Sequence, residues 1–349
     1  MFRICFYLLR KTTNNLYKEH YTNSFKGCII IKDIFTIKEL HKSYGDKEVL
    51  KGISFSIERG EVLGLIGSSG AGKTTLLNLL VGFIKPTKGQ IKVSIPQRNG
   101  LKQYDVTNKP LLVNKLYGFA SQRPSFYEKL SVRENLNYFG SMYGLSPESV
   151  KKNADILLRL LEIQTSQHVL AENLSGGMKR RLDIACALIH NPNILILDEP
   201  TADLDPVLRN QIWEIIKRIN QRGTTIILSS HHLNELDTLC SRIAILKDGV
   251  LADLDSPDKL KNKYNKEQEI MIESYPGDYK TIRYELEKKH ATTIQEEGTY
   301  LIIRTRESEK LITEVMSVLK KHKETLIDIK LNKPNLDDVF TSIYRGKKE

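Results

Sequence analysis

Hydrophobic and polar residues follow two periods along the chain, and the changes of period mark the expected elements. Residues 34–61 alternate between apolar and polar positions, as half-buried antiparallel strands do. Further on, short apolar runs typical of buried strands alternate with segments of helical spacing. The expected strands are 61–67, 87–93, 193–200 and 224–232, and the expected helices are 74–84, 132–144, 147–163, 180–190, 207–219 and 233–240. This alternation predicts a mainly parallel sheet covered by helices.

The pattern changes at residues 262–267, where the polar stretch NKYNKE suits a linker. Beyond it we expect strands at 269–274, 292–295, 300–304 and 326–331 and helices at 279–290, 307–321 and 336–344. The order β-α-β-β-α-β before the last helix predicts a small ferredoxin-like α+β domain. The expected organisation is therefore a basic arm (1–33), a large α/β domain (34–261) and a C-terminal accessory domain (268–349).

The charge of the chain is distinctly positive, at +11 over 349 residues. The arm carries six Lys and Arg against Glu19 and Asp33, which suits a disordered segment or a short basic segment on a membrane surface. A polyanionic partner would fit this charge, but no basic stripe with interleaved aromatic residues is present. Nucleic acid is therefore an unlikely partner.

The cysteines and the apolar runs place further limits on the class of protein. The four cysteines are scattered, without a C-x-x-C pair or metal-ligand spacing: Cys5, Cys28, Cys186 and Cys240. This usage predicts a reduced, cytoplasmic protein. No apolar run approaches the roughly 18–20 residues that a membrane-spanning helix needs.

The segment GSSGAGKTT (67–75) follows an apolar run and opens a helical pattern, which is the setting of a phosphate-binding loop. Its glycines let successive N–H groups face phosphate oxygens. Lys73 would bring positive charge to the β- and γ-phosphates, and the Thr74 hydroxyl would reach Mg²⁺. The predicted nucleotide contacts are Gly67, Ser68, Ser69, Gly70, Ala71, Gly72, Lys73, Thr74 and Thr75.

Two adjacent carboxylates end the apolar run ILILDEP (194–200). Asp198 suits a Mg²⁺ site, directly or through water. Glu199 could polarise an attacking water, which is the base role in phosphoryl transfer to water. Alternatively, the pair could cap a helix at its positive end, but the phosphate loop upstream favours the first interpretation.

A second segment, NLSGGMKRRLDIA (173–185), also suits an anion. Ser175 could cap a helix, and the two glycines leave backbone N–H groups accessible. Three basic residues, Lys179, Arg180 and Arg181, follow at the positive end of the expected helix, where the dipole disfavours them. They could either contribute to binding the anion or face solvent.

Six motifs occur in one order: SYG, GSSGAGKTT, ASQRP, LSGGMKRR, ILILDEPTADLDP and ILSSHH. With them, residues 34–260 resemble the nucleotide-binding subunit of an ATP-binding cassette (ABC) transporter. The resemblance implies the P-loop NTPase fold of an ABC cassette, with a mixed sheet core, an antiparallel β subdomain and a helical subdomain at about 125–182. It also implies ATP and Mg²⁺ as cofactors and ATP hydrolysis as the activity.

The resemblance assigns roles to further residues. Tyr44 matches the aromatic residue that stacks on adenine. Gln122 matches the glutamine that senses Mg²⁺ and the attacking water beside the groove for a membrane partner. His231 matches the histidine that contacts the γ-phosphate, so Glu199, His231 and Gln122 form the expected catalytic set. Thr74, Asp198 and Gln122 are the expected metal contacts.

The same resemblance implies a function for the second anion segment (173–185). In this family, Ser175, Gly176 and Gly177 would bind the ATP held by the phosphate loop of another subunit, and Asp205 would cross to that subunit. We therefore expect a head-to-tail dimer with two shared sites, either a homodimer or a pair with a related ATPase. One departure is Asp203, at a position where exporter-like relatives usually carry Gly.

The expected function is to power a separate integral membrane permease, which would dock near Gln122–Tyr127 and hold the subunit at the inner face of the membrane. Export is favoured, because SGGM followed by KRRL and the tail KPNLDDVFTSIY resemble the drug- and multi-purpose exporter branch. The alternatives are an ABC importer and a soluble ABC ATPase that acts on nucleic acid or ribosomes. A non-catalytic binding role is disfavoured, because the catalytic motifs are intact.

Overall fold

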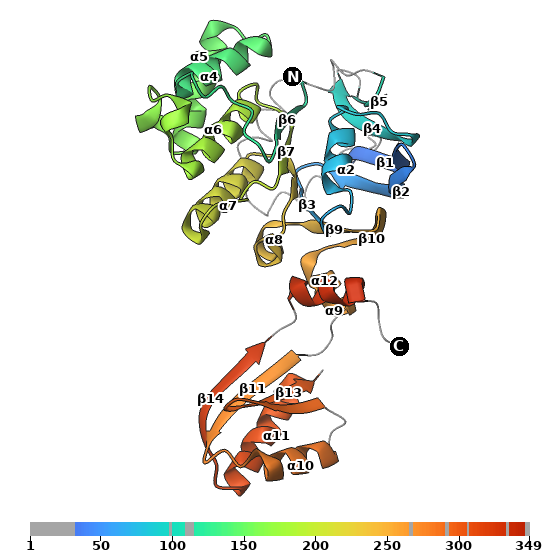
Figure 1. Ribbon diagram of the computed structural model, residues 1–349, viewed down its shortest axis with the longest axis vertical. Helices are drawn as coiled ribbons and strands as arrows, with labels where there is room; N and C mark the ends of the chain where they lie inside the picture. Colours follow the sequence, from blue (N-terminus) through green and yellow to red (C-terminus); the bar gives the residue numbers. More distant parts are fainter. Residues whose placement is uncertain are drawn as a thin grey trace, which may run out of the picture. The chain divides into compact units, whose positions relative to one another are not determined.

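The chain forms two compact units, which divide between Ser256 and Pro257 (Figure 1). The computed structural model describes residues 32–97, 100–108, 115–264, 268–289, 293–305, 307–332 and 335–345. The expected N-terminal arm, apart from its last two residues, lies outside these ranges. The division falls several residues before the expected domain boundary.

An antiparallel sheet in the first unit has the strand order β2-β1-β4-β5. Its strands are β1 (Asp33–Tyr44), β2 (Lys47–Glu58), β4 (Lys88–Gln97) and β5 (Gly100–Asp105). Phe35 pairs with Ile57 across β1 and β2, so the alternating pattern places one apolar face toward the core.

A six-stranded sheet forms the centre of the first unit, in the order β10-β9-β3-β8-β7-β6. Its strands are β3 (Val62–Ile66), β6 (Tyr117–Ala120), β7 (Ile194–Asp198), β8 (Thr225–Ser229), β9 (Arg242–Lys247) and β10 (Val250–Asp255). All pairings are parallel except that of β9 with β10. Every residue of β3, β7 and β8 is buried, which explains their continuous apolar runs.

The helices described in the first unit are α2 (Lys73–Leu80), α4 (Val132–Met142), α5 (Pro147–Leu160), α6 (Gly176–Leu188), α7 (Pro206–Gln221) and α8 (Leu233–Leu239). Four of these six helices, α4 to α7, begin after a residue whose side chain caps them. Ser131 and Glu134 form a reciprocal capping box at α4, and Ser146 caps α5 just before a proline. Short 3₁₀ turns occupy Gln164–Ser166 and Ala171–Asn173.

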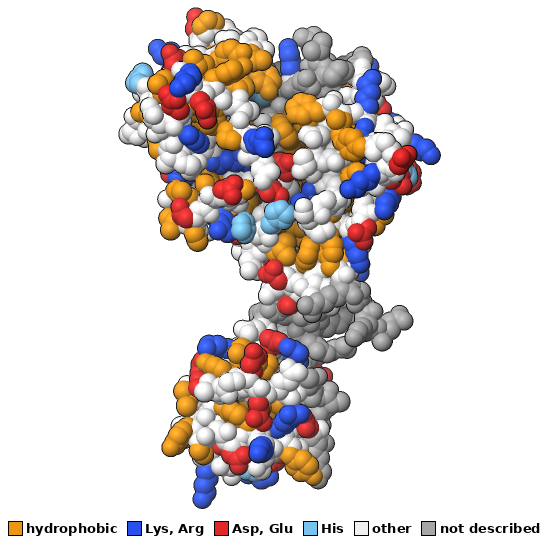
Figure 2. Space-filling model, viewed as in Figure 1, with side chains coloured by type: hydrophobic (Ala, Val, Ile, Leu, Met, Phe, Trp, Pro, Cys, Tyr) orange, Lys and Arg blue, Asp and Glu red, His pale blue; other side chains and the backbone are white. Residues whose placement is uncertain are grey.

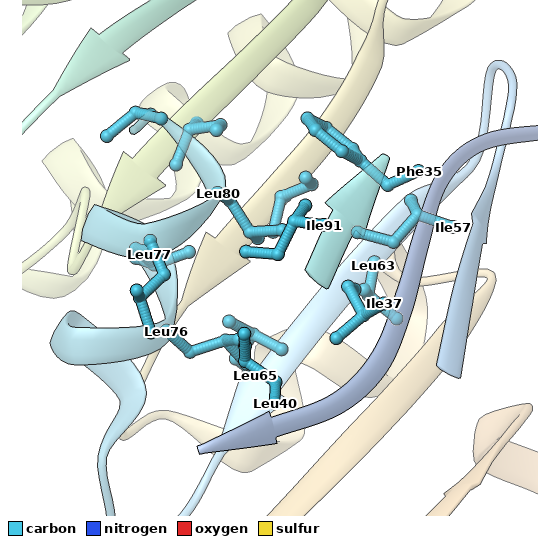
Figure 3. Close-up of a cluster of buried hydrophobic side chains, with 14 of the residues drawn as sticks. Phe35, Ile37, Leu40, Ile57, Leu63, Leu65, Leu76, Leu77, Leu80 and Ile91 are labelled. Atoms are coloured by element: carbon cyan, nitrogen blue, oxygen red, sulfur yellow. The ribbon is translucent and has the colours of Figure 1, made fainter. Parts of the chain in front are cut away.

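The main hydrophobic core lies between the two sheets and around α2 (Figures 1 and 3). Phe35, Ile37 and Ile57 of the antiparallel sheet enter the same cluster as Leu63 and Leu77. This core fixes β3 and α2, and with them the loop that joins them. Cys186 and Cys240 are buried and free, while Cys5 and Cys28 lie outside the described residues.

The second unit is an antiparallel four-stranded sheet with its own core. Its elements are α9 (Pro257–Tyr264), β11 (Gln268–Tyr275), α10 (Tyr279–Lys289), β12 (Thr293–Glu297), β13 (Tyr300–Thr305), α11 (Ser308–Lys321), β14 (Thr325–Asn332) and α12 (Leu336–Arg345). The strand order β12-β13-β11-β14 follows the expected β-α-β-β-α-β layout. Ile270, Leu301 and Val315 lie in the core that joins the sheet to α10 and α11.

The linker expected at 262–267 is wrong in its first half. Residues 262–264 end α9, which packs against α12 within the second unit. Leu260, Leu336 and Val339 are buried, so an apolar stripe on each helix outweighs the polar character of NKYNKE. Residues 265–267 lie outside the described ranges.

Within the residues that the structure describes, no helix combines the length and the apolar character needed to cross a membrane.

Candidate nucleotide site

The loop between β3 and α2 presents a backbone concavity at a helix start. Gly70 and Gly72 have φ values of +82° and +102°, which side-chain-bearing residues rarely adopt. A Cβ on Gly67 would come within 2.6 Å of the Leu246 carbonyl oxygen. Ser69, Gly70 and Thr74 are exposed, so the concavity opens to solvent. Its N–H groups and the Thr74 hydroxyl fit a nucleotide phosphate and its Mg²⁺.

Lys73 is the buried cation of this loop. Its ammonium donates to the carbonyl oxygens of Gly67 at 2.8 Å and Ser68 at 3.3 Å. Burial lowers the pKa of Lys73, and the charges of Glu199 and Asp198 partly oppose this. The hydrogen bonds of this ammonium to Gly67 and Ser68 are to neutral carbonyl oxygens, so contact with charged phosphate oxygens would be a stronger, charge-assisted interaction.

Asp198 ends β7 beside the end of β8, where Ser229 is its paired residue. The Ser229 hydroxyl donates to Asp198 Oδ1 at 2.6 Å and accepts from the Glu199 N–H at 2.9 Å. Ser229 was not identified from the sequence. It could have been, because the ends of adjacent parallel strands meet at one sheet edge. Among the described residues, no cluster of three His, Cys, Asp or Glu side chains could hold a metal ion. Single carboxylate, amide and hydroxyl oxygens fit Mg²⁺, which is usually bound together with phosphate.

Glu199, His231 and Gln122, the expected catalytic set, are brought together. His231 Nε2 lies 2.5 Å from Glu199 Oε1, and Gln122 Nε2 donates to Glu199 Oε2 at 3.3 Å. The Glu199 backbone is left-handed, with φ +50°, which is strained for a non-glycine residue. The glutamate carboxylate is thus oriented by two side chains from other segments, next to the carboxylate of Asp198.

The second anion segment forms the exposed start of α6. Ser175 is the N-cap and accepts from the Met178 N–H at 3.4 Å, as the sequence predicts. Ser175 and Gly176 are exposed, whereas Gly177 is buried, and a Cβ there would meet Leu208 at 2.9 Å. Ser175 and Gly176 at this helix start are therefore accessible from solvent.

Two other expected contacts are also exposed. Asp205 caps α7 by accepting from the N–H groups of Val207 and Leu208. Tyr44 is 50% exposed at the end of β1, with Lys42 Nζ 4.9 Å from its ring centre.

Of the three basic residues after the glycine pair, Lys179 is half-buried, whereas the two arginines depart from both alternatives left open by the sequence. Arg180 and Arg181 are buried and neither faces solvent nor lies at the exposed helix start. Arg181 donates to the Leu161 carbonyl oxygen at 3.1 Å and to Gln211 Oε1 at 2.6 Å, so it joins α6 to neighbouring segments. Arg180 bonds to segments near Glu199. Their burial had no local sequence signal.

Known proteins are similar to this chain in sequence. Residues 50–202 match the family described as ABC transporter. The linearmycin resistance ATP-binding protein of Bacillus subtilis is 30% identical, over 88% of this chain and 96% of the relative. The Nod factor export ATP-binding protein I of Bradyrhizobium diazoefficiens is 34% identical, over 86% of this chain and 93% of the relative.

Solved structures of ABC cassettes are also similar to this chain. An ATP-binding subunit of an ABC transporter, 28% identical, covers 66% of this chain and 93% of its own, with a TM-score of 0.58. A dimeric ATP-binding cassette in a post-hydrolysis state with ADP and Pi, 27% identical, covers 64% of this chain and 98% of its own, with a TM-score of 0.56. The phosphate loop, the carboxylates after β7 and these likenesses show that the chain belongs to the ABC transporter family, as a subunit that binds and hydrolyses ATP.

Proposed function

We propose that the chain hydrolyses ATP at two shared sites in a head-to-tail dimer and thereby drives a separate permease in the direction of export. The observation that carries this proposal is the set formed by Glu199, His231 and Gln122, whose glutamate charge acts on Lys73 of the phosphate loop, together with the exposed start of α6. One chain thus contains two half-sites that point to different nucleotides.

Each residue of the first half-site has a chemical task. The loop N–H groups and Lys73 bind the β- and γ-phosphates, while Tyr44 stacks on the adenine. Mg²⁺, held through Thr74, Asp198 and Gln122, would offset the charge on the phosphate oxygens. Glu199 accepts the proton of the attacking water, and His231 orients the Glu199 carboxylate and contacts the γ-phosphate.

The second half-site serves the partner. Ser175 and the N–H groups of Gly176 and Gly177 bind the γ-phosphate of the other subunit's ATP, and Asp205 lies at the same junction. Two-fold symmetry then completes two equal sites in a homodimer, or two related sites with another ATPase. Loss of the γ-phosphate removes the contact between the halves and lets them separate.

The surface beyond Gln122 supports docking of the permease. Tyr127 is 48% exposed and Tyr138 is 41% exposed; their ring centres lie 4.7 Å apart and their hydroxyl oxygens 3.2 Å apart, so the pair forms an exposed aromatic surface with polar tips. Binding there would hold the subunit at the inner face of the membrane. Export rather than import follows the names of the relatives, which concern resistance and Nod factor export.

Nucleic acid finds no comparable support as a partner. On the face of the described residues shown in Figure 2, Lys and Arg side chains are interspersed with Asp and Glu. A phosphate backbone is bound by continuous basic stripes rather than by such a mixture.

The test uses the Glu199→Gln variant with ATP and Mg²⁺. Turnover should fall at least about 10²-fold, because the proton acceptor is lost. Since bound ATP then persists, sedimentation should show an ATP-dependent dimer. The Ser175→Arg variant is the matched case: it should bind ATP through Lys73 but neither dimerise nor hydrolyse it. Normal turnover by Ser175→Arg, or a Glu199→Gln variant that stays monomeric with ATP, would overturn the shared-site proposal.

A further inference from the structure

The Arg180 side chain is buried on α6 and bonds to three backbone carbonyl groups. Its Nε donates to the Pro200 oxygen at 2.8 Å, and its Nη2 donates to the Asp198 oxygen at 3.2 Å. Its Nη1 donates to the Ser121 oxygen at 2.7 Å. The residue is 7% exposed, so water does not replace these contacts easily.

These carbonyl groups border the residues of the reacting end of the site. Asp198 and Pro200 are the two neighbours of Glu199, so the guanidinium grips the chain on both sides of that residue. The left-handed φ of Glu199 is disfavoured for a side-chain-bearing residue and persists only where its surroundings impose it. Ser121 precedes Gln122, whose side-chain amide donates to Oε2 of the Glu199 carboxylate.

Asp183 completes the arrangement one helical turn after Arg180. Its carboxylate is fully buried, lies 3.2 Å from Arg180 Nη1, and accepts from the N–H and the hydroxyl of Ser125 at 3.0 and 2.9 Å. Burial raises the pKa of Asp183, while Arg180 and the Ser125 bonds oppose that rise. Asp183 therefore neutralises the buried guanidinium of Arg180, and through Ser125 it joins the segment after Gln122 to α6.

We propose that Arg180 is a positioning residue for ATP hydrolysis: it holds the backbone of Glu199 and of Gln122 in the geometry that their side chains need. Asp183 supports it by fixing the guanidinium. The proposal rests on the role of Glu199 given under Proposed function. It also gives α6 two tasks, because the helix that presents Ser175 to a partner's nucleotide holds the base of the chain's own site.

Arg181 offers a matched control on the same helix. Its exposed fraction is 8%, nearly that of Arg180, and it also donates to a buried carbonyl oxygen. Its other contacts are Gln211 Oε1 and Glu162, on α7 and in the turn after α5, rather than the neighbours of Glu199. Loss of either arginine should destabilise the fold, but only loss of Arg180 should move Glu199.

The experiment compares ATP turnover by the full-length wild type and the Arg180→Gln, Arg180→Lys and Arg181→Gln variants, below their melting temperatures. Arg180→Gln should lower kcat about 10²-fold with KM for ATP unchanged, because displacement of a reacting group by about 1 Å costs that much. Arg180→Lys keeps the charge but not the planar fork of donors, so its kcat should lie between those of the wild type and Arg180→Gln. Arg181→Gln should melt earlier and keep the wild-type kcat.

Each outcome decides the inference. Equal kcat for Arg180→Gln and Arg181→Gln, or a loss expressed in KM alone, would overturn the positioning role. If Arg180→Gln does not fold, Arg180→Lys takes its place in the test, and a wild-type kcat for Arg180→Lys would overturn the positioning role. Glu199→Gln is measured alongside. Wild-type turnover by that variant would refute the proposed role of Glu199 itself. If Glu199→Gln is inactive, the role of Glu199 stands and the comparison of the arginine variants tests the role of Arg180 alone.

Discussion

Protonation of His190 should weaken the first unit as the pH falls. The residue follows α6, and its ring stacks on Tyr143 with 3.6 Å between ring centres. Nε2 lies 3.1 Å from the Tyr117 carbonyl oxygen, whereas Nδ1 is buried with no hydrogen-bond partner among the residues that the structure covers. A neutral ring with hydrogen on Nε2 satisfies this site, and a proton on Nδ1 would have no acceptor.

The size of the effect follows from the pKa of His190. Burial lowers this pKa from 6.5 to about 4, although the bond to Tyr117 opposes the change. Because the unfolded chain binds a proton more readily than the folded chain, stability is complete above pH 6.5 and is lost as the pH falls toward 4. Between pH 7 and pH 4.5 the expected loss in the free energy of unfolding from this residue is about 2.5 kcal/mol.

The His190→Phe variant isolates this contribution, because phenylalanine keeps the stacked ring but has no titrating group. At pH 7 the variant should be less stable by about 1 kcal/mol, the value of a lost hydrogen bond. At pH 4.5 it should be the more stable protein. Urea unfolding can be followed by the fluorescence of Trp213, the single tryptophan of the chain, which lies in α7 of the first unit. Parallel pH dependence in the two proteins would refute the reasoning.

Two further predictions concern packing and buried hydrogen bonds. Gly118→Ala would place a Cβ 2.0 Å from the Ala187 carbonyl oxygen, so the free energy of unfolding of the first unit should fall by about 3 kcal/mol. The fall would be measured as a lower urea midpoint, and an unchanged midpoint would contradict the close approach of β6 and α6. Glu324→Ala removes the acceptor of bonds from the Ser274 hydroxyl and the N–H groups of Gly277 and Asp278, so the second unit should lose about 2–3 kcal/mol. Hydrogen exchange of β11 and β14 amides measures that loss, and unchanged protection would count against it.

The sequence predicts best the features that depend on neighbouring residues. The phosphate loop, the cap at Ser175 and the carboxylates after β7 are each written in a few adjacent positions, because turn geometry and helix capping are local. From β11 onward the second unit was predicted in element order for the same reason, since those strands and helices have clear periods, whereas α9 was not predicted.

Features that depend on distant segments were not predicted. The strands β5, β6, β9 and β10 were not identified; β6 has only four residues, too few to show a period. Arg180 was judged by its place at a helix start, whereas the three carbonyl groups to which it donates lie 18–59 residues away in the chain. Such contacts follow from the packing of α6 against the sheet, which no local pattern encodes.

The buried pair of Arg180 and Asp183 also has a consequence for how the first unit assembles. The guanidinium has its acceptors only when α6, the end of β7 and the segment after β6 are all in place. In a chain with α6 docked and either of the other segments loose, a desolvated charge would lose part of its bonding, at a cost of several kcal/mol. Half-assembled forms are therefore penalised, and the helix and the sheet edge should fold and unfold as one cooperative body.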